Sequence, residues 1–277
     1  MRLCAFADES DKTLEGQIAA LHRNGIDLIE LRNINKKNIA SFTLPEIREL
    51  KRRLDGEGIG VWSIGSPIGK IHFDGDLDSE LDVFRRLCEH TLELSCRHIR
   101  LFSFFGNTDG TSLCLERVLE RMNKYCEAAP SELILCHENE KGIYGDTDTR
   151  CLELLTSLPR LRAVYDPANF VQCGVDTVEA FDRLLPYIEY IHVKDALYDG
   201  RVVIAGKGDG QVRTVIEKYL KNGGDVITCE PHLKHFDGLS SLEHGEKTVI
   251  DSNFRTQPEA FDAGVCATKS IIGEILK

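Results

Sequence analysis

Four side chains that can bind a divalent metal close four consecutive strand-like runs in the second half of the sequence. Each run is short and apolar, and each ends in a carboxylate or an imidazole. The four residues are separated by 28, 26 and 38 positions, about the length of one strand–loop–helix–loop unit. Because a parallel barrel brings the carboxyl ends of its strands to one rim, we expect these side chains to meet there. They are Glu138, Asp166, His192 and Glu230.

Three carboxylates and one imidazole form a hard, mostly oxygen ligand set. Such a set suits Mn²⁺, Mg²⁺ or Co²⁺ better than a structural zinc site, which favours thiolates and imidazoles, although Zn²⁺ stays open. We therefore predict one bound divalent metal ion, with Mn²⁺ favoured. Four protein ligands on an octahedral ion leave two positions for a substrate that chelates the metal through two adjacent oxygens.

This ligand set suits the removal of a proton next to a carbonyl group. A divalent metal polarises the carbonyl and stabilises the negative charge of the enediolate. One carboxylate can remove the proton, and a second carboxylate on the opposite face of the substrate can return it. Glu138 and Glu230 are the natural acid/base pair, with Asp166 and His192 as ligands alone. Each residue taken singly is more often a helix cap or a structural group, so the prediction depends on all four strand ends.

Short apolar runs alternate with amphipathic stretches along the whole sequence, which is the pattern of a (β/α)₈ TIM barrel. We predict a single domain over residues 1–277. Helix starts are marked by capping residues at Thr43, Asp176 and Thr256. The longest irregular stretch, 232–255, follows the last strand. The predicted strands are 3–7, 27–31, 59–64, 98–102, 133–138, 161–166, 188–192 and 226–230, with later helices at 147–157, 177–185, 211–222 and 259–275.

Bulk composition excludes several classes of protein. The 277 residues suit one such barrel, typically ~250 residues long. A net charge of −11 argues against nucleic acid as a partner, because phosphate backbones are bound by concentrated Lys and Arg. No apolar run approaches the ~18 residues of a membrane span. Scattered cysteines and the absence of an export signal predict reduced thiols in the cytoplasm. A homo-oligomer is left open.

Short motifs occupy the predicted strand ends and the loops after them. They are Gly25-Ile-Asp-Leu-Ile-Glu-Leu31 with Glu30 near the site, His137-Glu-Asn-Glu140, Asp166-Pro-Ala-Asn169, Ile191-His-Val-Lys-Asp195, Ala205-Gly-Lys-Gly-Asp-Gly210 and Glu230-Pro-His232. In these motifs, which extend over nearly the whole chain, the sequence resembles the sugar phosphate isomerase/epimerase superfamily, the barrels similar to xylose isomerase. The resemblance implies the four metal ligands and the acid/base pair named above.

Two positions depart from the motifs of that superfamily. Many ketose epimerases have a histidine where this chain has Asn169, which can hydrogen-bond a hydroxyl but cannot carry charge. Those enzymes also tend to place an arginine where this chain has Tyr198, with Arg201 nearby. Both departures argue against a simple ketohexose 3-epimerase.

Further polar residues near the strand ends are predicted to contact the substrate. Lys194 shares the inward face of His192 and can bind a substrate oxygen or phosphate, or form a salt bridge with a rim carboxylate. Lys207 lies in a Gly-rich loop that can wrap a phosphate or form a plain turn. The complete set is Asn169, Lys194, His232, Lys207 and Lys141.

We therefore expect a metal-dependent isomerase or epimerase of a sugar or sugar phosphate, acting by proton transfer through an enediolate. The first alternative is a dehydratase of the inosose type, which begins with the same proton abstraction and then expels water. A DNA-repair nuclease related to endonuclease IV is a second alternative, and a barrel that binds ligands without catalysis is a third.

Overall fold

A closed barrel of eight parallel strands forms the centre of the protein. The computed structural model describes residues 1–106, 112–236, 239 and 248–277. The strand order is β1–β12–β9–β8–β7–β6–β5–β2, and β1 also pairs with β2, which closes the sheet. The predicted (β/α)₈ barrel is confirmed. The strands are β1 Arg2–Ala5, β2 Leu28–Leu31, β5 Gly60–Gly65, β6 His98–Leu101, β7 Ile134–Glu138, β8 Leu161–Tyr165, β9 Ile188–Val193 and β12 Val226–Cys229.

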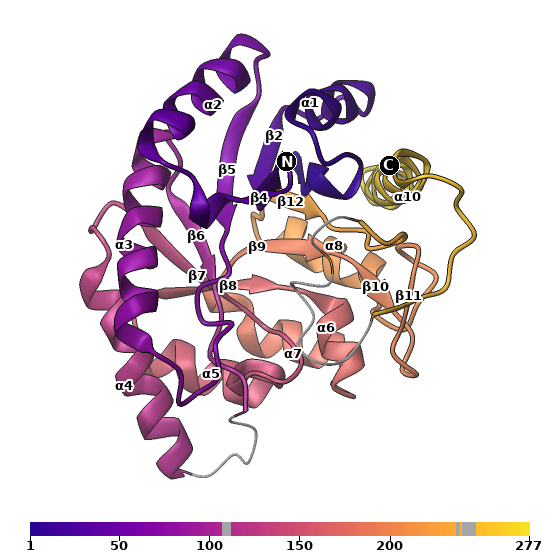
Figure 1. The fold of residues 1–277 in the computed structure, drawn as a ribbon. Helices are drawn as coiled ribbons and strands as arrows, with labels where there is room; N and C mark the ends of the chain where they lie inside the picture. Colours follow the sequence, from indigo (N-terminus) through magenta and orange to yellow (C-terminus); the bar gives the residue numbers. More distant parts are fainter. Residues whose placement is uncertain (107–111, 237–238, 240–247) are drawn as a thin grey trace.

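Helices surround the barrel, as Figure 1 shows, and α10 lies beside α1 near the N-terminus. None of the described helices combines the length and the hydropathy that a membrane span requires. The helices are α1 Leu14–Arg23, α2 Leu44–Gly56, α3 Leu77–Glu93, α4 Ser112–Ala128, α5 Asp148–Ser157, α6 Pro167–Gln172, α7 Thr177–Leu184, α8 Val212–Lys221 and α10 Gln257–Ile275.

The predicted capping residues begin their helices. The side chain of Glu46 accepts a 2.7 Å hydrogen bond from the backbone N–H of Thr43 at the start of α2. Asp176 accepts two backbone N–H groups at the start of α7, and Thr256 accepts one at the start of α10. Because these groups satisfy N–H donors that the first turn leaves unpaired, they fix where each chain segment turns away from the barrel.

Short strands on the rim add to the barrel. A small sheet consists of β10 Asp195–Ala196, β11 Arg201–Val203 and β13 Val249–Ile250, and a hairpin consists of β3 Asn33–Ile34 and β4 Lys37–Asn38. The sequence predicts an irregular stretch at 232–255. Residues 237–238 and 240–247 lie outside the described part of the chain, but Val249–Ile250 is a strand. Two residues are too short for a periodic signal, and their pairing with β11 is a tertiary contact.

The Gly-rich loop after β11 wraps a buried carboxylate of the protein itself. Asp195 accepts hydrogen bonds from the backbone N–H groups of Gly206, Gly208 and Gly210 at 2.8, 2.9 and 3.0 Å. A side chain at Gly208 or Gly210 would collide with the Asp195 carboxylate, so glycine is required for this close approach. In this arrangement the three amides bind Asp195.

Replacing Asp195 by alanine should destabilise the fold. The N–H groups of Gly206, Gly208 and Gly210, whose hydrogen bonds are partly or fully buried, would lose their acceptor, which costs about 3 kcal/mol of unfolding free energy. Urea denaturation followed by circular dichroism measures the change. Asp199→Ala is the matched control, because Asp199 is exposed on the neighbouring loop and pairs with Arg201 at the surface. Equal urea midpoints for the two variants would show that the loop does not depend on Asp195.

Candidate metal centre

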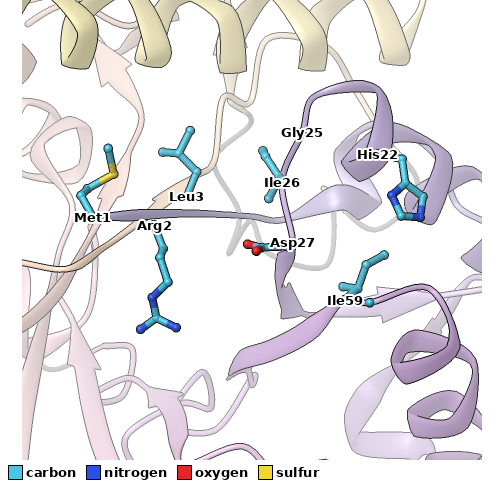
Figure 2. A pocket seen from close by; sticks show the side chains of 9 residues that line it. Met1, Arg2, Leu3, His22, Gly25, Ile26, Asp27 and Ile59 are labelled. Atoms are coloured by element: carbon cyan, nitrogen blue, oxygen red, sulfur yellow. The ribbon is translucent and has the colours of Figure 1, made fainter.

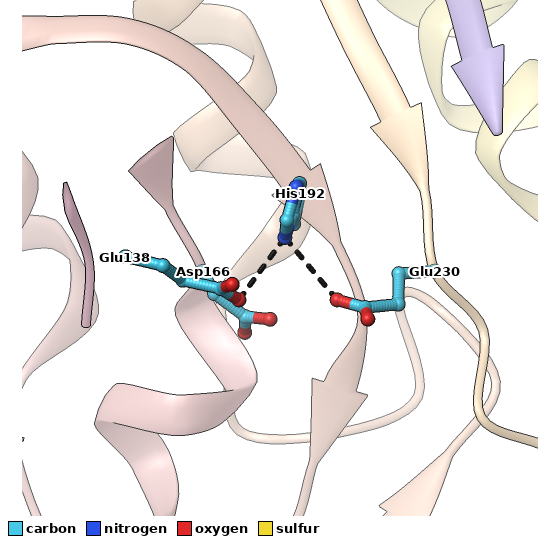
Figure 3. A group of neighbouring side chains, drawn as sticks. All are labelled: Glu138, Asp166, His192 and Glu230. Atoms are coloured by element: carbon cyan, nitrogen blue, oxygen red, sulfur yellow. Dashed lines mark hydrogen bonds and ion pairs between the residues drawn. The ribbon is translucent and has the colours of Figure 1, made fainter. Parts of the chain in front are cut away.

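The four strand-end side chains converge at the carboxyl end of the barrel (Figure 3). Each offers one ligand atom, and these atoms all lie within 4.8 Å of one another. All four side chains are buried. His192 Nδ1 lies 3.1 Å from Glu138 Oε1 and 3.2 Å from Glu230 Oε2, so the imidazole nitrogen faces two carboxylates from different strands. The structure thus brings together Glu138, Asp166, His192 and Glu230.

Glu30, at the end of β2, orients the imidazole of His192. Its Oε2 lies 3.2 Å from His192 Nε2 and accepts a 3.0 Å hydrogen bond from Thr228 Oγ1. Its Oε1 accepts a 2.8 Å hydrogen bond from the hydroxyl of Tyr190. Because the Nε2–H donates to Glu30, Nδ1 is the nitrogen left for a cation. A carboxylate behind a ligating histidine in this way fixes the tautomer and raises the basicity of the imidazole.

The imidazole of His192 is electrostatically poised to hold positive charge. Burial alone would lower its pKa, but the carboxylates of Glu138 and Glu30 raise that pKa well above its usual value. For the Glu138 carboxyl the effects have the opposite sign. Burial alone would raise its pKa, but the positive charges of His192 and Arg100 outweigh burial and lower that pKa to about 2. The carboxylates therefore attract a cation to the space around Nδ1, and a proton takes that place when no metal does.

Negative charge exceeds positive charge around this cluster. Among the described residues, six buried carboxylates share the network with three cations of the Arg and Lys type. Burial and the neighbouring acids raise the pKa of Asp166 to about 6 and that of Glu9 to about 8. A divalent cation would offset most of this excess. The carboxylates are Asp8, Glu9, Glu30, Glu138, Asp166 and Glu230, and the cations are Arg32, Arg100 and Lys194.

Several buried oxygens of the cluster lack a hydrogen bond. They are Glu138 Oε2, Asp166 Oδ2 and Glu230 Oε2. Arg100 Nη1 and Lys194 Nζ approach the first two at 3.0 and 2.9 Å, but without hydrogen-bond alignment. A buried oxygen without a hydrogen bond is costly, and a metal ion coordinated by all three would offset that cost. The donor set and these oxygens fit a divalent metal.

Basic side chains behind the ligands fix the orientation of the carboxylates. Arg100 Nη1 binds Glu138, Lys194 Nζ binds Asp166, and Arg32 Nη1 lies 2.8 Å from Glu230 Oε1. Arg32 and Arg100 were missed by the sequence analysis. Both lie in or directly after short apolar runs, where a pattern search for metal ligands passes over arginine. Their position in or directly after a predicted strand was the signal that the sequence offered.

The predicted substrate contacts fall into two groups. Asn169 and His232 are buried beside the ligands, and the Asn169 amide donates a 2.8 Å hydrogen bond to the carbonyl of Asn139. Lys194 forms an ion pair with Asp166, which is the alternative role predicted for it. Lys207 and Lys141 are exposed on loops. The substrate-binding roles of all five stay predictions.

Glu9, Glu230 and His232 form a second cluster of ligand types. His232 Nε2 lies 3.4 Å from both Glu9 Oε1 and Glu230 Oε1. The guanidinium of Arg32 also faces this space, at 2.8 Å from Glu230 and 3.5 Å from Glu9, and it binds Asp8 through two nitrogens. Because Arg32 already supplies positive charge here, the first cluster is the better metal centre.

A separate pocket lies at the opposite end of the barrel (Figure 2). It has a volume of about 470 Å³ and is lined by the segments that lead into β1, β2 and β5. Its titratable side chains are Arg2, His22 and Asp27. His22 lies 3.2 Å from the exposed Glu57. Among the described residues, no cluster of converging carboxylates lies at this end of the barrel, as catalytic TIM barrels lead us to expect.

The chain belongs to the xylose isomerase-like TIM barrel family, whose model matches residues 18–251. A 3-dehydroshikimate dehydratase from Bacillus anthracis is 20% identical over 245 residues, which cover 84% of this chain and 87% of that protein. The family includes sugar isomerases and epimerases.

Solved structures show the same fold at low sequence identity. An L-ribulose 3-epimerase has a TM-score of 0.75 at 16% identity, covering 99% of this chain and 95% of the other. An IolI protein with a bound zinc atom has a TM-score of 0.74 at 15% identity, covering 99% of each chain.

Replacing Glu30 by glutamine should weaken metal binding without removing a ligand. Loss of the carboxylate behind a ligating histidine typically lowers metal affinity about 10–100-fold. Isothermal titration of the protein with Mn²⁺ measures the change. Glu57→Gln is the matched control, because Glu57 forms the exposed pair with His22 at the far end of the barrel. Unchanged Mn²⁺ affinity in Glu30→Gln would contradict the orienting role of Glu30.

Proposed function

We propose that this protein is a divalent-metal-dependent isomerase or epimerase of a sugar or sugar phosphate. The arrangement of two carboxylates carries the proposal. Glu138 and Glu230 approach His192 Nδ1 from opposite sides, and each is held by its own arginine. Membership of a family of sugar isomerases and epimerases supports the same conclusion. We propose Mn²⁺ as the metal, held by the four strand-end residues, with Mg²⁺, Co²⁺ or Zn²⁺ as alternatives.

Glu138 and Glu230 would divide the proton transfer between them. The pKa of Glu230 is well below its usual value, because Lys194 and His232 outweigh the effect of burial. Both groups are therefore carboxylates that can accept a proton. One removes the proton next to the substrate carbonyl, and the C–H electron pair becomes the enediolate double bond. The other returns a proton from the opposite face.

The metal and the basic residues support this transfer in different ways. A divalent cation bound here would polarise the carbonyl and stabilise the charge of the enediolate. Arg100 and Asn169 hold Glu138, while Arg32 holds Glu230, so neither carboxylate has to be ordered during the reaction.

A dehydratase is the second candidate, and one observation favours it. The 3-dehydroshikimate dehydratase relative matches most of the chain. Dehydration begins with the same proton abstraction, and the enediolate or enolate then expels a hydroxyl group as water. An inosose-type dehydratase would use the same residues. A DNA-repair nuclease is less favoured, since the four-residue cluster contains three carboxylates and a single imidazole.

Incubation of the Mn²⁺-loaded protein in D₂O separates the two candidates. With L-ribulose or a ketose phosphate as substrate, an isomerase or epimerase introduces deuterium at carbon and otherwise leaves the composition unchanged. With 3-dehydroshikimate, a dehydratase produces a product lighter by one water. Mass spectrometry and proton NMR follow both. Loss of water from 3-dehydroshikimate without exchange in any ketose would replace the first proposal by the second.

Glu138→Gln and Glu230→Gln should each reduce proton exchange at least about 10²-fold, which is the usual contribution of a general base. Glu132→Gln is the matched control, because Glu132 is exposed near the start of the strand that carries Glu138. Metal content is measured for each variant, so that loss of metal is distinguished from loss of the base. Wild-type exchange rates in either metal-loaded site variant would contradict the two-carboxylate mechanism.

A further inference from the structure

A buried carboxylate lies inside the barrel, behind the imidazole of the proposed metal centre. Glu30, on β2, is only 1% exposed. Among the described residues it forms no ion pair with an arginine or a lysine. Its partners are the imidazole of His192 and the hydroxyl groups of Tyr190 and Thr228, which come from β9 and β12. The orientation of this carboxylate therefore depends on two hydroxyl groups.

The hydroxyl group of Tyr190 connects two other side chains. Its oxygen lies 2.8 Å from Glu30 Oε1 and 3.0 Å from Ser63 Oγ. Because an ionised carboxylate can only accept hydrogen bonds, the single phenolic proton is donated to Glu30. Ser63 then donates its own proton to the phenolic oxygen. The hydrogen bonds therefore run in one direction, from Ser63 through Tyr190 to Glu30.

The hydroxyl group of Thr228 holds the second oxygen of the same carboxylate. It donates a 3.0 Å hydrogen bond to Glu30 Oε2, the oxygen that lies 3.2 Å from His192 Nε2. Thr228 is also the direct partner of His192 in the ladder between β12 and β9, so the strands fix the two groups relative to each other. Because Tyr190 holds Oε1 and Thr228 holds Oε2, the carboxylate cannot rotate without losing a hydrogen bond.

The position of this carboxylate determines which nitrogen of His192 faces the metal centre. With Oε2 fixed beside Nε2, the proton lies on Nε2, and Nδ1 is left facing the carboxylates of Glu138 and Glu230. A mobile carboxylate at Glu30 would let the ring turn or exchange its proton between the two nitrogens. Holding Glu30 therefore holds the ligand atom of His192.

Aromatic packing keeps the phenol ring of Tyr190 in place. The ring meets Trp62 edge-on, with 5.8 Å between the ring centres, and its centre lies 5.5 Å from that of His192. Tyr190 is fully buried, so a hydroxyl group without an acceptor would be costly there. The hydrogen bond to Glu30 is thus formed before a metal ion arrives.

We propose that Tyr190 and Thr228 are positioning residues of the metal centre, which act through Glu30 and hold His192 with Nδ1 directed at the metal. Ser63 supports Tyr190 from the other side. The inference rests on the proposed function, because it concerns the metal ion that the proposed reaction requires. It adds to the metal centre two hydroxyl groups that reach it through a carboxylate.

Removing single hydroxyl groups tests this inference. Isothermal titration of the full chain with Mn²⁺ gives the affinity for the metal. Tyr190→Phe and Thr228→Val keep the shape of the side chain, and each should lower this affinity about fivefold. The loss should be smaller than that expected for Glu30→Gln, because the hydroxyl groups act through that carboxylate.

Two control variants each remove a buried hydroxyl group elsewhere. Tyr219→Phe removes a donor that forms a 2.9 Å hydrogen bond with the carbonyl of Val226, at the opposite end of the barrel. Thr268→Val removes a donor that forms a 3.0 Å hydrogen bond with the carbonyl of Gly264 within α10. All four variants should unfold at similarly reduced urea concentrations, because each loses one buried hydrogen bond. Both controls should keep the Mn²⁺ affinity of the wild-type protein.

A double-mutant cycle shows whether the hydroxyl group of Tyr190 acts through Glu30. In a protein that already carries Glu30→Gln, the further change Tyr190→Phe should alter the Mn²⁺ affinity less than about twofold, since the carboxylate that it positions is absent. An equal loss of affinity in both backgrounds would show that the effect does not pass through Glu30, and would overturn the inference.

The remaining outcomes separate this inference from the proposed function. If the wild-type protein binds Mn²⁺ and either Tyr190→Phe or Thr228→Val binds it equally well or more tightly, that residue has no positioning role, and the metal-dependent function stays in place. A protein that takes up no divalent metal would contradict the proposed function, and the inference would fall with it.

Discussion

Burying six carboxylates at one end of a barrel is the constraint on which the site depends. Each carboxylate loses hydration, and an unpaired buried charge is strongly destabilising. Arg32, Arg100 and Lys194 compensate part of the charge, and each of them contacts a different carboxylate of the proposed metal centre. Burial and the neighbouring acids raise the pKa of Asp166, and the carboxylates around His192 raise the pKa of its imidazole against the effect of burial. An acidic centre with this residual charge is electrostatically suited to a cation.

The barrel makes this concentration of charge feasible. Its strands end at one rim, so residues far apart in sequence contribute side chains to one small volume. Around the rim, backbone and side-chain hydrogen bonds fix the loops that carry those side chains. Asp195 accepts backbone hydrogen bonds from the Gly-rich loop after β11, and Glu80 accepts a hydrogen bond from the N–H of Gly69 in the loop after β5. These contacts fix the loops at the carboxyl ends of the strands. The relative positions of the four strand-end side chains depend on these loops.

Much of this arrangement could be predicted from the sequence. The alternation of apolar runs and amphipathic helices predicted the barrel, and the type of residue at four strand ends predicted the cluster. Both signals are local. The roles of Arg32 and Arg100 could not be predicted, because a buried arginine depends on carboxylates contributed by distant strands. The sequence leaves the Gly-rich loop open between a phosphate-binding loop and a plain turn, and its partner Asp195 becomes visible only when β10 and β11 are placed together.

The central claim is that the four strand-end side chains bind one divalent metal ion. Anomalous diffraction from crystals grown with Mn²⁺ tests it most directly. We expect a single strong peak enclosed by the carboxylates of Glu138, Asp166 and Glu230 and by Nδ1 of His192. No peak at that position, or a peak between Glu9 and His232 instead, would contradict it.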